Sequence, residues 1–137
     1  MRAIRGKDTR PEMVVRKALH AAGFRFRLHR RDLPGKPDLV LPRDRAVIFV
    51  HGCFWHQHDC SAFKMPDERG DFWRTKFQAN VARDRYVRDQ LLQQGWRVAQ
   101  VWECSLRGRN KLGIDVVASS LADWIRSDSG SIELRES

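Results

Sequence analysis

The stretch DLVLPRDRAVIFV, residues 38–50, decides the fold. It holds two short apolar runs separated by the polar segment PRDR, a pattern that predicts a hairpin of two buried strands. FRFRL at 24–28 alternates as a half-buried strand does, and RVAQVW at 97–102 is predicted to be a further strand. Strands are therefore expected at the centre of the domain.

Helices are predicted around these strands. TRPE at 9–12 resembles a capping box with proline in the first turn, so a helix should follow it and end near Gly23. A long helix is expected from about residue 72 to 94, closed by Gly95, and 113–125 has apolar residues at helical spacing. Residues 127–137 are expected to form a flexible tail. The order of elements predicts one α/β domain over residues 1–126, with helices flanking a mixed central sheet.

The composition points to a polyanionic partner. The 137 residues include 26 Lys and Arg against 17 Asp and Glu, a formal net charge of +9. Such an excess on a small domain favours nucleic acid. Three cysteines argue against a closed disulfide framework and favour metal binding in a reducing cytoplasm. No apolar run approaches the roughly 18 residues of a membrane span, so no membrane partner is expected.

The stretch HGCFWHQHDC, residues 51–60, predicts a zinc site. The spacing of Cys53, His58 and Cys60 can wrap three ligands onto one ion, and Cys104, just after a predicted strand, could supply a fourth. A closed site of this kind would be structural. The alternative for Cys104 is a buried, inert thiol.

Two histidines of the same stretch would remain beside the zinc. Either His51 or His56 could act as a general acid or base near neutral pH. An ordinary hydrogen-bonded histidine explains His51 equally well.

Three carboxylates are candidates for a site. Asp38 opens a buried strand after a proline, which suits a hard cation, although a turn-capping aspartate is the stronger reading of that motif alone. Glu12 either completes the capping box with Thr9, which has the stronger local argument, or helps to hold a metal-bound water. Asp84 should face the protein body, as a buried salt-bridge partner or as a site residue, because it lies on the helical stripe Trp73, Phe77, Val81, Arg88 and Leu91.

Together the segments MRAIRGKDTRPE, LPGKPDLVL, VIFVHGCFWHQHDC, FW..K...N..RD and GWRV..VWEC.LRG resemble the very-short-patch (VSR) mismatch repair endonucleases. The resemblance covers roughly residues 1–111, with the motifs in the same order. It implies a restriction-endonuclease-like α/β fold. It also implies nicking of double-stranded DNA on the 5′ side of a thymine mispaired with guanine, the product of 5-methylcytosine deamination.

The resemblance further implies a catalytic Mg²⁺ held by Asp38 and the backbone carbonyl of Val50. A common nuclease of the PD-(D/E)xK type would offer an acidic side chain and a lysine here, and this chain offers neither. His56 would act as general acid or base. Around the water and phosphate the resemblance places His51, Glu12 and Asp84. The structural Zn²⁺ would be held by Cys53, His58, Cys60 and Cys104.

DNA contacts are also expected from the resemblance. Phe54 and Trp55 would wedge between base pairs, joined by Trp73, although core packing is the alternative for the first two. The further expected contacts are Lys76, Asn80 and Met1. Family members carry a short basic segment before the stretch that begins here at Met1, so a trimmed or shorter member is expected.

Other functions remain open from the residues alone. A restriction or defence nuclease of the same fold would cut another DNA target. A catalytically silent, zinc-stabilised DNA-binding module would bind without cutting, and a zinc hydrolase would need an open coordination position. The resemblance suggests a monomer on DNA, accompanied by mismatch-repair proteins and a cytosine methyltransferase.

Overall fold

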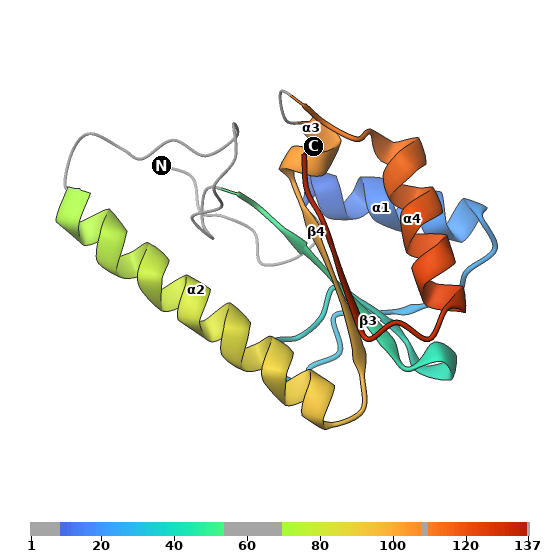
Figure 1. Cartoon of the computed structure of the whole chain (residues 1–137), viewed down its shortest axis with the longest axis horizontal. Coiled ribbons are helices and arrows are strands. Elements are labelled where there is room, and N and C mark those ends of the chain that lie inside the picture. The colour runs from blue at the N-terminus through green and yellow to red at the C-terminus, as the bar shows by residue number, and fades with distance from the viewer. Residues whose placement is uncertain (1–8, 54–69, 108–109, 137) are drawn as a thin grey trace.

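The protein is a mixed five-stranded sheet flanked by helices (Figure 1). The computed structural model describes residues 9–53, 70–107 and 110–136. Its helices are α1 Arg10–Ala21, η1 Pro42–Asp44, α2 Gly70–Gln93, α3 Cys104–Arg107 and α4 Ile114–Arg126. Its strands are β1 Arg27–Leu28, β2 Leu39–Leu41, β3 Ala46–His51, β4 Arg97–Trp102 and β5 Ser131–Leu134.

The strands follow one another across the sheet in chain order. The first three are antiparallel neighbours, whereas β3, β4 and β5 run parallel. The β2–β3 pair is the predicted hairpin, with Leu39 opposite Ile48 and Leu41 opposite Ala46. The predicted mixed α/β architecture is thus confirmed.

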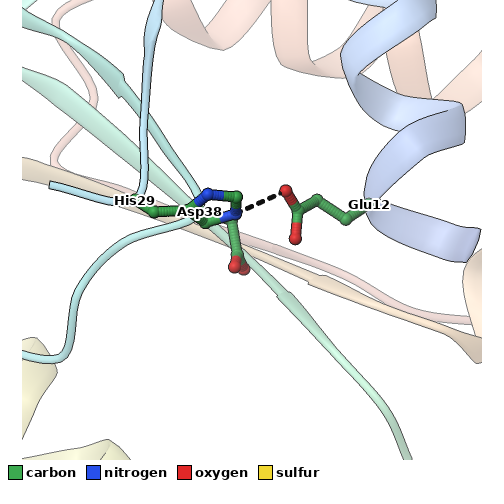
Figure 2. A group of neighbouring side chains, drawn as sticks. All are labelled: Glu12, His29 and Asp38. Carbon is green, nitrogen blue, oxygen red and sulfur yellow. Dashed lines mark hydrogen bonds and ion pairs between the residues drawn. The ribbon is translucent and has the colours of Figure 1, made fainter. Parts of the chain in front are cut away.

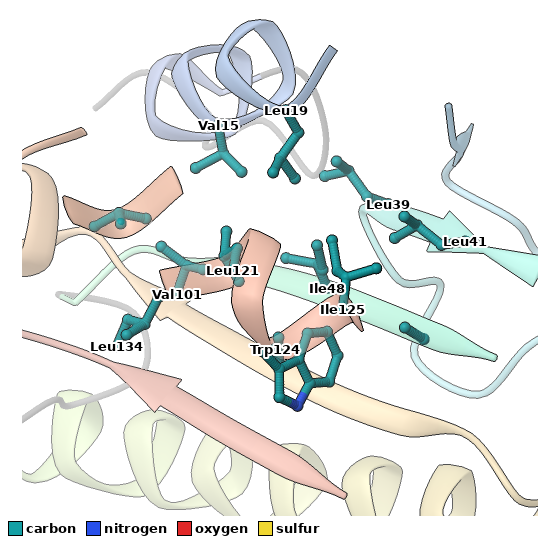
Figure 3. Close-up of a cluster of buried hydrophobic side chains, with 13 residues drawn as sticks. Val15, Leu19, Leu39, Leu41, Ile48, Val101, Leu121, Trp124, Ile125 and Leu134 are labelled. Atoms are coloured by element: carbon teal, nitrogen blue, oxygen red, sulfur yellow. The ribbon is translucent and has the colours of Figure 1, made fainter. Parts of the chain in front are cut away.

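Helices cover both faces of the sheet. The helices α1 and α4 contact each other on one face, and α2 lies on the opposite face (Figure 1). Because side chains of a strand alternate, Ile48 enters the core under α1 and α4, whereas Val47 enters the core under α2. Figure 3 shows the larger core, in which Val15 and Leu19 of α1 meet Leu121 of α4.

The predicted helix boundaries are close to those observed. Thr9 caps α1, because its side-chain oxygen accepts a hydrogen bond from the backbone N–H of Glu12 over 3.4 Å. The helix α2 ends two residues before Gly95, whose positive φ of +88° suits a residue without a Cβ. The guanidinium of Arg45 binds the last carbonyls of this helix end, including that of Gln94 at 2.9 Å. This contact ties α2 to the turn of the β2–β3 hairpin.

Two sequence predictions need correction. The flexible tail predicted over 127–137 is wrong for Ser131–Leu134, which forms β5 beside β4, with Leu134 buried. The indole N–H of Trp102 also donates a hydrogen bond to the Glu133 carboxylate over 2.6 Å. The strand predicted over 24–28 is shorter, since only Arg27–Leu28 pairs with β2, whereas Phe24 and Phe26 pack against the core. In both places tertiary contacts outweigh a weak local pattern.

Among the described helices, none has both the length and the apolar composition that a membrane crossing requires.

Candidate active site

Asp38 lies at the open end of the β2–β3 hairpin. It immediately precedes β2, and its side-chain Oδ2 accepts a hydrogen bond from the backbone N–H of Val50 over 2.7 Å. The ladder between the two strands has its last pair at Leu39 and Ile48. Beyond that pair the backbone N–H of Val50 in β3 is bonded to the Asp38 carboxylate instead of to a backbone carbonyl of β2. The hydrogen bond fixes one carboxylate oxygen on the sheet.

Glu12 approaches the same place from α1. Its side chain is only 1% exposed, and its Oε2 lies 2.7 Å from Nε2 of His29. The guanidinium of Arg16, one turn further along α1, lies 3.5 Å from the same oxygen. A buried carboxylate needs such partners. The Glu12 side chain therefore faces the interior, while its backbone N–H is used by the Thr9 cap.

His29 completes the group and was not predicted from the sequence. It follows β1 directly, and its backbone N–H donates to the carbonyl of Asp38 over 3.2 Å. Its φ is +49°, in the left-handed region that residues other than glycine adopt infrequently. Figure 2 shows the side chains of Glu12, His29 and Asp38 converging. One potential ligand atom from each lies within 4.8 Å of the others, close enough to hold one metal ion.

The electrostatics of Asp38 favour a cation. Burial is the main cause that raises the pKa of Asp38 to about 7; the nearby Glu12 carboxylate adds to the shift, and the hydrogen bond from Val50 opposes it. Two carboxylates that share a buried place repel each other when both are charged. A divalent cation between them would remove that repulsion, and carboxylate oxygens are the ligands that Mg²⁺ prefers. The residues present therefore fit a magnesium ion.

His51 ends β3 and is held between aromatic rings. It is 7% exposed, and its ring lies 4.6 Å from that of Trp102 and 5.8 Å from that of Phe49. Such packing restricts the motion of the ring. The role in proton transfer predicted for His51 is not tested by this arrangement.

The predicted stripe of α2 faces the sheet. Phe77 and Leu91 are buried, and Asp84 lies half-buried between them on the same side of the helix. One turn after Asp84, Val87 packs against Gly35 so closely that a Cβ on this glycine would overlap the Val87 side chain. This contact joins the middle of α2 to the turn that leads into Asp38.

The first half of α2 carries the predicted DNA contacts that the structure describes. Trp73 is half-buried and its ring stacks on Phe77 at 5.7 Å. Lys76 is exposed, with its ammonium 6.0 Å from the Phe72 ring, and Asn80 is half-buried.

Cys53 and Cys104 come together as the zinc prediction requires. Both are fully buried, and the backbone N–H of Cys104 donates to the sulfur of Cys53 over 3.4 Å. The backbone N–H of Glu136 donates to the sulfur of Cys104 over 3.4 Å. The two cysteines are not joined by a disulfide. Backbone hydrogen bonds to sulfur are common outer-shell support for metal-bound thiolates, so these two residues fit half of a zinc site.

Six predicted site residues lie outside the described part of the chain: Met1, Phe54, Trp55, His56, His58 and Cys60. His29 was missed because the sequence shows it as the first residue of the basic run HRRD. The only local signal was its position nine residues before Asp38, across the turn LPGKP.

Comparisons with known proteins define the class of protein. A family model described as DNA mismatch endonuclease Vsr matches residues 1–62. The DNA mismatch endonuclease Vsr of Escherichia coli K12 is 45% identical over 134 residues, which cover 98% of this chain and 86% of that protein. The type II nicking enzyme V.XorIIP of Xanthomonas oryzae pv. oryzae is 55% identical over 106 residues, 77% of this chain and 78% of that protein.

These similarities, together with the α/β fold, define a nuclease. The chain belongs to the family of DNA mismatch endonucleases Vsr. The resemblance inferred from its motifs is thereby confirmed.

Proposed function

We propose that this nuclease is the strand-nicking enzyme of very-short-patch repair. It hydrolyses the phosphodiester on the 5′ side of a thymine in a T:G mismatch that arises from deamination of 5-methylcytosine, and it depends on Mg²⁺. The observation that carries the proposal is the half-buried Asp38 beside the buried Glu12 at the open end of the β2–β3 hairpin. The name of the E. coli relative supports the mismatch as substrate.

The magnesium site would use Asp38 and Glu12, with the backbone carbonyl of Val50 as a further ligand. Bound there, Mg²⁺ would polarise the scissile phosphate and stabilise the leaving oxygen. The chain prepares this site in two ways: Val50 fixes one oxygen of Asp38, and Arg16 and His29 orient the Glu12 carboxylate. Preorganised charges of this kind need little rearrangement when the reaction begins.

Proton transfer is assigned to histidines. His56 would accept or donate the proton of the attacking water, with His51 and Asp84 orienting the water or the phosphate. The ring of His51 is supported by Trp102, which restricts its motion.

DNA binding follows from charge and from aromatic side chains. The net charge of +9 supplies attraction to the phosphate backbone. Phe54 and Trp55, with Trp73, would wedge into the duplex, where insertion costs least because the mismatch already weakens stacking. Lys76, Asn80 and Met1 would make the further contacts.

We propose a restriction-endonuclease-like, cytoplasmic enzyme that acts as a monomer.

The zinc ion would be structural, on Cys53, His58, Cys60 and Cys104. The buried contact between Cys53 and Cys104 supports this assignment. A closed set of four ligands leaves no position for substrate. The ion would therefore stabilise the segment that carries Phe54 and Trp55 and would take no part in catalysis.

The test is a nicking assay on end-labelled duplexes. One duplex carries a T:G mismatch and the other is fully paired, each with and without Mg²⁺, and Asp38→Asn is the matched variant. We expect one magnesium-dependent nick 5′ to the mismatched thymine, absent on paired DNA and in the variant. Cleavage of both duplexes would instead indicate a restriction or defence nuclease, and binding without cleavage would indicate a silent DNA-binding module.

A further inference from the structure

His29 is the residue of the Glu12–His29–Asp38 group to which the proposed function gives no chemistry of its own. Its imidazole nitrogen lies 2.7 Å from Oε2 of Glu12, and its backbone is hydrogen-bonded to the carbonyl of Asp38. It therefore contacts both carboxylate residues, one through its side chain and one through its main chain.

The distances suit three ligands of one ion. Donors bound at about 2.1 Å to an octahedral ion lie about 3 Å apart when adjacent and about 4.2 Å apart when opposite. The three candidate ligand atoms all lie within 4.8 Å of one another. A small inward shift of the side chains would place each of them at bonding distance from a common centre.

The exposure of the group leaves a path for an ion. The side chain of His29 is 20% exposed, whereas that of Glu12 is 1% exposed. The carboxylate thus forms the back of the site and the imidazole its accessible edge. The left-handed backbone of His29 is a conformation that residues other than glycine adopt infrequently, and such strain is often found at functional positions.

We propose that His29 is a nitrogen ligand that completes a mixed metal site with Glu12 and Asp38, and that this site holds a first-row transition ion such as Mn²⁺ more tightly than Mg²⁺. The inference rests on the proposed metal-dependent function and deepens it. A site of carboxylate oxygens alone suits Mg²⁺, Ca²⁺ and Mn²⁺ alike, but an imidazole adds a bond that the transition ion accepts far more readily than the two hard ions do.

The test measures metal binding to the full chain without DNA. Mn²⁺ is titrated into the zinc-loaded protein in magnesium-free buffer, free Mn²⁺ is followed by electron paramagnetic resonance, and Mg²⁺ is then added as competitor. Mn²⁺ is the right probe because thiolate sites do not select it over zinc. Pulsed measurements on the bound Mn²⁺ detect directly coordinated nitrogen.

Three variants separate the possible roles. His29→Gln keeps a side chain that can hydrogen-bond to Glu12 but removes the imidazole. His29→Asn tolerates the left-handed backbone and is too short to ligate, so it guards against a folding defect in the first variant. His20→Gln removes an exposed histidine at the end of α1 and serves as the matched control.

We expect both His29 variants to lose Mn²⁺ affinity by about tenfold, the lower end of what neighbouring groups contribute to metal affinity. Their Mg²⁺ affinity should change less than about twofold, and the nitrogen coupling should vanish, while His20→Gln behaves as the wild type. Equal losses for Mn²⁺ and Mg²⁺ would overturn the inference, because His29 would then only position Glu12. Unchanged Mn²⁺ binding in the His29 variants would overturn it as well.

The nicking assay and the variant Asp38→Asn distinguish a failure of the proposed function from a failure of the inference about His29. If mismatch nicking with Mg²⁺ is intact but no nitrogen coupling is found, only the role of His29 fails. If Asp38→Asn leaves both Mn²⁺ binding and nicking unchanged, the metal centre itself is wrong and both proposals fail.

Discussion

The side-chain Oδ2 of Asp38 and the backbone N–H of Val50 are joined by a 2.7 Å hydrogen bond at the point where the β2–β3 ladder ends. The same carboxylate has its pKa raised to about 7, mainly by burial and further by Glu12. The contact thus holds an ionisable group where its charge is costly unless a cation is present. Such a cost is typical of sites that bind a cation or perform catalysis.

The first prediction concerns pH. Below about pH 4, Asp38 is protonated in both the folded and the unfolded chain, so it costs no stability. Above about pH 7 it is ionised in both, and the folded state carries the full penalty. The free energy of unfolding of the magnesium-free protein should therefore fall through this window.

Asp38→Asn should abolish this dependence, since the amide stays neutral and its oxygen can still accept the Val50 hydrogen bond. We expect the variant to be more stable than the wild type at pH 8 by a few kcal/mol, at about 1.4 kcal/mol per pKa unit. At pH 4.5 the gain should be small. Urea unfolding at both pH values measures this, and an equal gain at both would contradict the assigned cause.

The second prediction concerns the contact between Gly35 and Val87. Gly35→Ala should destabilise the protein by about 2–4 kcal/mol, because it combines a positive φ of +74° with a Cβ that meets the Val87 side chain. Gly23→Ala is the control: its φ is +99°, but nothing lies within 4 Å of the added Cβ. It should cost only the conformational part, about 1–2 kcal/mol.

Val87→Ala should recover part of the Gly35→Ala loss when the two are combined, which urea unfolding of the double variant would show. A double variant whose losses simply add would mean that α2 does not press on the turn before Asp38.

The third prediction concerns the C-terminal strand. Leu134→Ala should lower the free energy of unfolding by about 2 kcal/mol or more, because Leu134 is buried in the core beneath α1 and α4. Ser131→Ala, at an exposed position of the same strand, should change it by less than about 0.5 kcal/mol. Chemical denaturation measures the free energy of unfolding of both variants. Equally small effects would indicate that residues 131–134 form a flexible tail, as the sequence predicted.

The fourth prediction concerns zinc. The wild type should contain a stoichiometric amount of zinc, and Cys104→Ser should lose most of it and unfold at lower temperature. Elemental analysis and thermal unfolding measure the two effects. Full zinc retention in Cys104→Ser would argue against a closed four-ligand site. It would favour the alternative function of a zinc hydrolase, which needs an open coordination position.

Much of the site could be predicted from motifs, but its internal arrangement could not. The pairing of Cys53 with Cys104 was expected from ligand spacing, whereas Asp38 and Glu12 were expected in the site from the family resemblance, since their local patterns favoured a turn cap and a capping box. His29 was not expected, because its part in the group depends on a left-handed turn and on α1 lying above the hairpin. Nothing in the run HRRD distinguishes a ligand from a solvated basic residue.

The amino-acid sequence alone determined the hairpin at 38–50, the long helix, the buried stripe of α2 and the family. Each of these follows from a pattern within a short stretch of sequence, either a period of 2 or 3.6 residues or a short motif. Only the tertiary structure decided that Glu12 turns inward, that His29 meets it, and that Ser131–Leu134 becomes a strand. Each of these depends on packing between segments far apart in the chain. Their free energies come from burial and hydrogen bonds that no local pattern records.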